Sequence, residues 1–144
     1  MWSFLKMLRN VLAGLVTVFV LLFLGAWGYS IWDRPHYVAE ILKIESIPKS
    51  AKVADCDSWG FTDVLVTCAL TIAPKDFDQL LLGYPFNYSK DQRSSHSLGG
   101  PDVGEEFEAV HVYGVWPSEF VHGGAVHVYA NASKDKVIVD LYIE

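Results

Sequence analysis

The chain has 144 residues, enough for one small domain, and 51% of them are hydrophobic, which is more than a soluble domain of this size usually contains. With 17 acidic and 11 basic side chains, its formal net charge is −6 at pH 7. This acidic balance lacks the positive footprint that displaces phosphate counterions, so it argues against nucleic acid as a partner.

The hydrophobic excess lies near the amino terminus. Residues 11–32 contain no charged side chain, and as a helix they would be long enough to cross a bilayer core of about 30 Å. Lys6 and Arg9 precede this run, and a basic flank favours the cytoplasmic side. We therefore expect a single-pass signal anchor at residues 11–32, with residues 1–10 in the cytoplasm and residues 33–144 outside it.

Two further features bear on this segment. Trp27, Tyr29 and Trp32 crowd its far end, which is typical of the aromatic belt at a membrane interface. A cleaved secretory signal is the alternative, because Ala26 and Gly28 are small enough for a weak cleavage site. The length of the run and its interruption by Trp27 favour the uncleaved anchor. We expect it in the inner membrane of a bacterium, with the rest of the chain in the periplasm.

The part expected to be exported is strongly acidic. All 17 acidic side chains but only nine of the 11 basic ones lie in residues 33–144, which gives this part a net charge of −8. Such a charge disfavours a domain lying flat on anionic headgroups and favours a basic partner. Cys56 and Cys68 both lie here, and in an oxidising compartment we expect them to form a disulfide worth about 3 kcal/mol.

The apolar helix is expected to end at Arg34-Pro35, because proline removes a backbone donor and disfavours the helical conformation of the residue before it. Residues 37–47 fit a helix or a strand, and we favour a strand over residues 41–47.

A hairpin is predicted next. Residues 64–72 alternate with a two-residue period and are rich in β-branched side chains, which indicates a strand. The glycine turn before them would fold residues 53–57 back alongside, bringing Cys56 near Cys68.

A short helix is predicted over residues 74–82, because Pro74 suits a first turn, Phe77 and Leu80 share an apolar stripe, and a glycine follows. Residues 84–108 are dense in Ser, Gly, Pro and charge without any period, so we expect a long surface loop.

The pentapeptide AVHVY occurs twice, at residues 109–113 and 125–129, and the alternating residues 137–143 follow. Three such strands predict an antiparallel meander at the carboxyl terminus. With the earlier elements, the sequence predicts an α+β domain in which a curved antiparallel sheet carries one helix packed on its valine face.

The repeated histidine raises the question of a metal site. If the two copies pair around Glu119, His111 lies opposite His127, and two imidazoles at that distance could begin a zinc site with His122 as a third ligand. The repeat lacks the helical spacing of HExxH, and paired His and Tyr also fit ordinary cross-strand packing. We favour the structural interpretation and expect no cofactor, with zinc at these three residues as the alternative.

The sequence contains no GxSxG elbow, phosphate loop, Rossmann fingerprint or paired-cysteine knuckle, which favours a role other than catalysis. The candidates for partner binding are Trp116 and Phe120, between the two AVHVY copies, and Glu105 and Glu106 in the long loop. The alternative for the two aromatic residues is that both rings pack beneath the hairpin.

Taken together, these features favour a membrane-anchored extracytoplasmic module that binds a protein, and an immunity or inhibitor protein against an exported toxin is one concrete version. A zinc-dependent envelope enzyme that uses the clustered histidines is an alternative from a different class. An accessory subunit of a membrane protein complex is a third.

Overall fold

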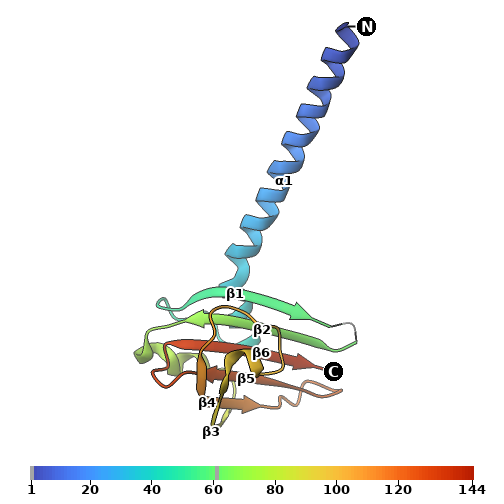
Figure 1. Ribbon diagram of the computed structural model, residues 1–144. Helices are drawn as coiled ribbons and strands as arrows, with labels where there is room; N and C mark the ends of the chain where they lie inside the picture. Colours follow the sequence, from blue (N-terminus) through green and yellow to red (C-terminus); the bar gives the residue numbers. More distant parts are fainter. Residues whose placement is uncertain (1, 61) are drawn as a thin grey trace. The chain divides into compact units, whose positions relative to one another are not determined.

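A computed structural model describes residues 2–60 and 62–144 of the chain, and the side chains of residues 2–5, 7, 8, 27 and 29–32 lie outside that description. The chain divides into two compact units, Met1–Asp33 and Arg34–Glu144. Helix α1 (Trp2–Leu42) supplies the described part of the first unit and contributes its last residues to the second (Figure 1).

Residues Arg9–Ala26 of α1 are long and apolar enough to cross a membrane, with a mean hydropathy of 2.0. By length and composition, an apolar helix at this end of a chain is either a membrane anchor or a signal sequence. The aromatic belt expected at Trp27, Tyr29 and Trp32 falls on side chains outside the described ones.

The helix does not end at Arg34-Pro35, because α1 continues through Pro35 to Leu42, and the strand predicted over residues 41–47 is therefore wrong. Val38, Ile41 and Leu42 recur at helical spacing and are buried in the core of the second unit. Pro35 costs one backbone hydrogen bond, and the burial of these apolar side chains outweighs that loss.

A Schellman motif closes α1. Lys43 adopts a left-handed conformation with φ 52°, and its N–H donates to the carbonyl of Glu40 at 3.1 Å. The N–H of Ile44 donates to the carbonyl of Ala39 at 3.0 Å, which completes the pair of bonds that defines this cap. The chain can then turn away and enter the sheet.

The second unit is built on one six-stranded antiparallel sheet with the strand order β1-β2-β6-β5-β4-β3 (Figure 1). In chain order the strands are β1 (Lys52–Trp59), β2 (Val64–Thr71), β3 (Asn87–Ser94), β4 (Glu108–Val115), β5 (Gly124–Ala130) and β6 (Lys136–Ile143). The antiparallel sheet, the β1–β2 hairpin and the carboxyl-terminal meander agree with the expected α+β class. Because β6 pairs with β2 as well as β5, the last strand lies inside the sheet.

Strand β3 was not expected. Residues 84–108 were predicted as one long loop, but they contain β3, the short 3-10 helix η2 (Ser95–Ser97) and the start of β4, so only residues 84–86 and 98–107 of this stretch remain irregular. The sequence of β3, NYSKDQRS, has no apolar alternation because β3 is an edge strand whose side chains are mostly exposed.

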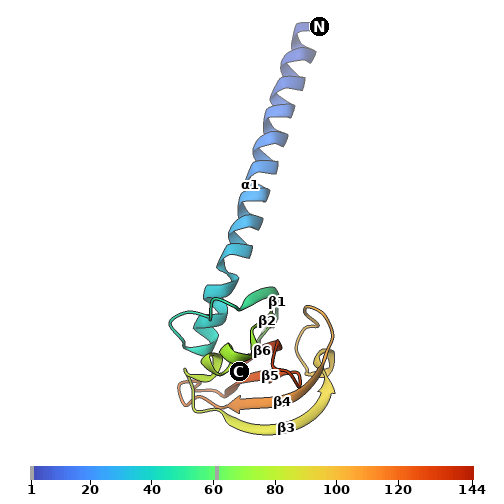
Figure 2. The ribbon, with the colours of Figure 1, turned by 90° about the vertical axis from the view of Figure 1, so that its left-hand side faces the viewer.

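The two faces of the sheet are covered differently, as Figure 2 shows. On the first, here the helix face, the end of α1 and the 3-10 helix η1 (Pro74–Leu81) cover the main core, with Phe77 and Leu80 of η1 buried. The helix expected over residues 74–82 thus exists in 3-10 form and shares its covering role with α1. On the second, here the loop face, residues 98–107 cover a smaller cluster in which Val103 packs with Tyr129 and Ile138.

Candidate functional site

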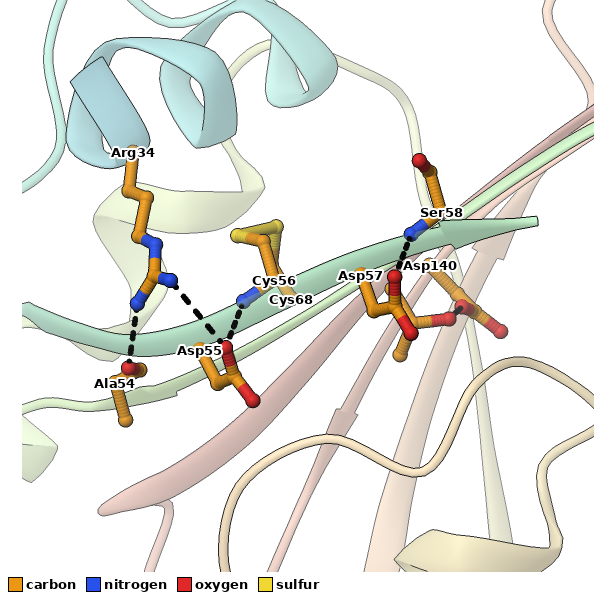
Figure 3. Close-up of a disulfide and its surroundings, with 9 residues drawn as sticks. Arg34, Ala54, Asp55, Cys56, Asp57, Ser58, Cys68 and Asp140 are labelled. Atoms are coloured by element: carbon orange, nitrogen blue, oxygen red, sulfur yellow. Dashed lines mark hydrogen bonds and ion pairs between the residues drawn. A yellow bond between two sulfur atoms is a disulfide. The ribbon is translucent and has the colours of Figure 1, made fainter. Parts of the chain in front are cut away.

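Cys56 and Cys68 form the expected disulfide (Figure 3). The two residues are direct partners in the β1–β2 register, with their Cα atoms 4.1 Å apart. This short spacing is that of a non-hydrogen-bonded pair, so the backbone N–H of Cys56 points away from β2 toward the outer edge of the sheet.

That outer edge of β1 is occupied by side chains of the same unit (Figure 3). Nη1 of Arg34 donates to the carbonyl of Ala54 at 2.9 Å, and the carboxylate of Asp55 accepts the N–H of Cys56 at 3.0 Å. The carboxylate of Asp57 accepts the N–H of Ser58 at 2.8 Å. These contacts block strand addition at β1, so a partner would have to dock on a face of the sheet at this side.

The structure does not bring the zinc candidates together. His111 pairs with Ala130, three residues beyond His127, and His127 pairs with Gly114. Because side chains alternate between faces, an odd shift in register places His111 on the helix face and His127 on the loop face. His122 is exposed in the β4–β5 loop, and the described part of the chain contains no group of three His, Cys, Asp or Glu side chains placed to hold a metal.

The two aromatic candidates also lie apart. Trp116 is 67% exposed and contacts His127 of the loop face edge-on, with ring centroids 5.8 Å apart. Phe120 is half-buried and packs against the core on the helix face. Trp116 is therefore open to a partner, whereas Phe120 is occupied within the fold.

The acidic candidates sit in residues 98–107. Glu105 accepts a hydrogen bond from Nζ of Lys136 at 3.0 Å in an exposed ion pair. Glu106 accepts the hydroxyl of Ser94 and helps to line a shallow pocket of about 420 Å³ beside Arg93 and Phe107. Both carboxylates have partners in the fold, and exposed pairs of this kind contribute little to stability.

A polar row that sequence reasoning missed crosses the loop face. Directly paired residues on five neighbouring strands share this face: Asp57, Thr67, Asp140, His127 and Gly114. A signal was present in the sequence, because Thr67, His127 and Asp140 are each a polar residue inside an otherwise apolar strand. Without the register, however, nothing indicated that these positions lie side by side.

Thr67 and Asp140 form the buried centre of this row. The hydroxyl of Thr67 donates to Oδ1 of Asp140, and the two side chains are 3% and 6% exposed. Gly100 lies directly over them, since a Cβ at that position would clash with Oγ1 of Thr67 and come within 2.9 Å of Oδ1 of Asp140. The pair therefore seats the loop on the sheet.

Burial controls the ionisation of this row. It raises the pKa of Asp140, against the smaller opposing effect of the hydrogen bond from Thr67. Burial also lowers the pKa of His127 and, with the nearby carboxylate of Asp140, raises the pKa of Tyr129 to about 12. The phenol of Tyr129, which stacks on His127 of this row, is thus held protonated.

Toward the β1–β2 and β4–β5 turns, the neighbouring row contains three aromatic side chains, of which the two tryptophans are exposed. Trp59, Leu65, Tyr142 and Ala125 are successive partners across four strands, and Trp116 follows β4 beside them. We call these five residues the tryptophan face. Trp59 is 77% and Trp116 67% exposed. Four strand spacings separate them, which corresponds to roughly 20 Å.

The surroundings of the tryptophan face are acidic. Residues 57–66, 98–104, 121–129 and 140–144 contain no lysine or arginine. The hydroxyl of Tyr142 donates to Glu144 at 3.0 Å, and this bond raises the pKa of Tyr142, with a further contribution from the charge of Asp63. A cationic surface would meet favourable charge here, and an anionic one would be repelled.

One end of the tryptophan face is hollowed. A shallow pocket of about 380 Å³ lies between the end of β1 and the loop, lined by Asp57, Ser58, Trp59, Gly99, Gly100, Pro101 and Asp102. Asp57, Trp59 and Asp102 are exposed, so their polar and aromatic groups are available to a ligand.

Comparison of the chain with protein-family models, with curated proteins and with solved structures gives no match. Its function has therefore to be argued from its own residues.

Proposed function

We propose that this chain is a membrane-anchored module that binds a basic protein partner through the tryptophan face. The observation that carries the proposal is the pair of exposed tryptophans, Trp59 and Trp116, on one sheet face whose neighbouring segments contain acidic residues but no lysine or arginine. Isolated apolar side chains on a surface need no explanation, but two large indoles on one face mark an interaction surface.

The size and chemistry of the surface favour a protein over a small substrate. Trp is among the residues that contribute most to binding free energy in protein interfaces. A span of roughly 20 Å between the two indoles matches the width of a protein contact better than that of an enclosed ligand cavity. The charge around the face would steer a basic partner and discriminate against acidic ones.

Two features support a location at a membrane in an oxidising compartment. The apolar helix is long enough to remain as an anchor, and the Cys56–Cys68 disulfide fits a domain on the outer side of that membrane. We propose the orientation with the amino terminus in the cytoplasm, in the inner membrane of a bacterium, with Arg34–Glu144 in the periplasm. An immunity or inhibitor protein that neutralises a basic exported toxin would be one instance of such a module.

The experiment is a quantitative capture of partners by the full-length protein in detergent-solubilised membranes of the source cell. We expect Trp59→Ala and Trp116→Ala each to weaken the captured complex by roughly tenfold or more, because both remove an interface anchor. Leu82→Ala is the matched control, since Leu82 is 78% exposed but follows η1 on the helix face. Binding that depends equally on Leu82, or a strongly acidic partner, would contradict the proposal.

A further inference from the structure

We propose that the pocket between Trp59 and the loop residues Gly99–Asp102 receives an arginine or lysine side chain of the partner. This inference rests on the proposed function and names the contact that would select a basic partner. It concerns one end of the tryptophan face, whereas Trp116 lies at the other end.

The pocket combines the two groups that recognise an organic cation. The exposed indole of Trp59 offers a π face, on which a guanidinium or ammonium group can lie. The carboxylates of Asp57 and Asp102 line the same pocket and can accept hydrogen bonds from that group. A volume of about 380 Å³ is within the range of small-ligand pockets, so one long basic side chain can enter.

The two carboxylates remain free to pair with a cation. Oδ1 of Asp57 accepts the N–H of Ser58, and Oδ2 makes no bond to the described residues. Asp102 forms no hydrogen bond or ion pair within the part of the chain that the structure describes. A guanidinium that enters the pocket would therefore displace no internal cation from either acid.

The chemistry fits an organic cation better than a metal ion. The pocket offers two carboxylates on opposite walls, and the described residues contain no group of three metal-ligating side chains. An aromatic wall contributes nothing to metal coordination but attracts an organic cation that lies on its π face.

The pocket is preformed because its loop wall is fixed to the sheet. Gly100 packs on the buried Thr67–Asp140 pair, and Val103 is buried three residues later. A wall held by these contacts loses little conformational entropy when a ligand binds, which favours affinity.

The test uses the full-length protein in lipid nanodiscs and the indole N–H signals of its tryptophans in NMR spectra. The probe is the peptide Ac-Arg-Arg-Arg-NH₂, and the control peptide has citrulline, which is nearly isosteric but uncharged, in place of each arginine. We expect the arginine peptide to shift the Trp59 signal in a saturable way and the citrulline peptide to leave it in place. Asp102→Asn should weaken binding about threefold to fivefold, because it removes one charged contact.

Glu45→Gln is the matched control, since Glu45 is exposed outside the pocket and its substitution changes the net charge equally. Equal shifts with both peptides, or equal weakening by Asp102→Asn and Glu45→Gln, would overturn the inference. The pocket and the proposed function can fail separately. Partner capture that depends on Trp116 but not on Asp102 would support the proposed function and reject the pocket. A pocket that binds the peptide in an Asp102-dependent way stands even if Trp116→Ala leaves partner capture unchanged.

Discussion

At the scale of single residues, Asp140 is the side chain most constrained by its surroundings. A carboxyl group is rarely buried unless it is paired, and Asp140 is satisfied by the hydroxyl of Thr67. Because burial raises its pKa, the folded state holds the proton of Asp140 more readily than the unfolded chain, where the ordinary value is 3.8. Its contribution to stability is therefore largest below pH 3.8 and is lost as the pH rises through the folded-state pKa.

We expect Asp140→Asn to unfold at higher urea concentration than the wild-type protein at pH 7, because asparagine keeps an acceptor for Thr67 without a buried charge. The difference should shrink as the pH falls toward 3.8. Urea unfolding of the variant and the wild-type protein between pH 2 and 7, followed by tryptophan fluorescence, measures the difference. Asp135→Asn is a control of opposite sign, because hydrogen bonds from Ser133 and Asn131 lower the pKa of Asp135. This variant should be less stable than the wild-type protein at pH 7, and the difference should shrink below pH 3.8. A pH-independent difference for Asp140→Asn would show that its charge is not penalised by the fold.

Gly114 and His127 form a second residue-scale contact. A Cβ at Gly114 would lie 2.9 Å from Cδ2 of His127, whose ring is stacked on Tyr129 and touched by Trp116. We expect Gly114→Ala to cost about 1–3 kcal/mol of unfolding free energy, because the ring must move out of a packed position. In a His127→Ala background the same substitution should cost about 1 kcal/mol less, a coupling that a double-mutant cycle measures. Additive effects would mean that the ring does not limit this position.

At the scale of elements, the hairpins were predictable because each strand carries its own alternation. The register of β4 and β5 was not predictable, because two identical pentapeptides suggest a symmetric pairing around Glu119. In the structure, His111 lies opposite Ala130 instead. The edge strand β3 has no apolar alternation to reveal it, and the helical end of α1 was decided by burial against the sheet. Local pattern thus predicts the strands that carry an apolar alternation, whereas long-range packing decides how they pair and whether an ambiguous segment is helical.

The disulfide belongs to the same scale, because it fixes the β1–β2 hairpin. We expect reduction of the wild-type protein to lower its free energy of unfolding by about 3 kcal/mol. The bond joins residues 12 positions apart and so lowers the conformational entropy of the unfolded chain. Unfolding in denaturant with and without a reductant measures this. A Cys56→Ala plus Cys68→Ala variant is the control and should not respond to the reductant. An unchanged wild-type midpoint would mean that the hairpin holds its pairing without the bond.

At the scale of the whole molecule, the sequence predicted the apolar helix and the α+β class, and it named Trp116 as a candidate contact, a side chain that is exposed in the structure. It did not identify Trp59 as the second indole of one surface, because β1 and β4 are distant in sequence and are brought into one row only through β2, β6 and β5. It also grouped Phe120 with Trp116, although the two rings serve opposite faces of the sheet. A surface row assembled across five strands cannot be recognised from any one of them.

Site-specific photocrosslinking in the source cell would show directly which protein, if any, contacts the tryptophan face. A photoreactive phenylalanine would replace Trp59, Trp116 or, as a control for exposure alone, Leu82 in the full-length protein. We predict that positions 59 and 116 crosslink to one protein through segments rich in lysine or arginine, that position 82 does not, and that raised ionic strength reduces the yield. Equal crosslinking from position 82, or contact segments that are predominantly acidic, would contradict it.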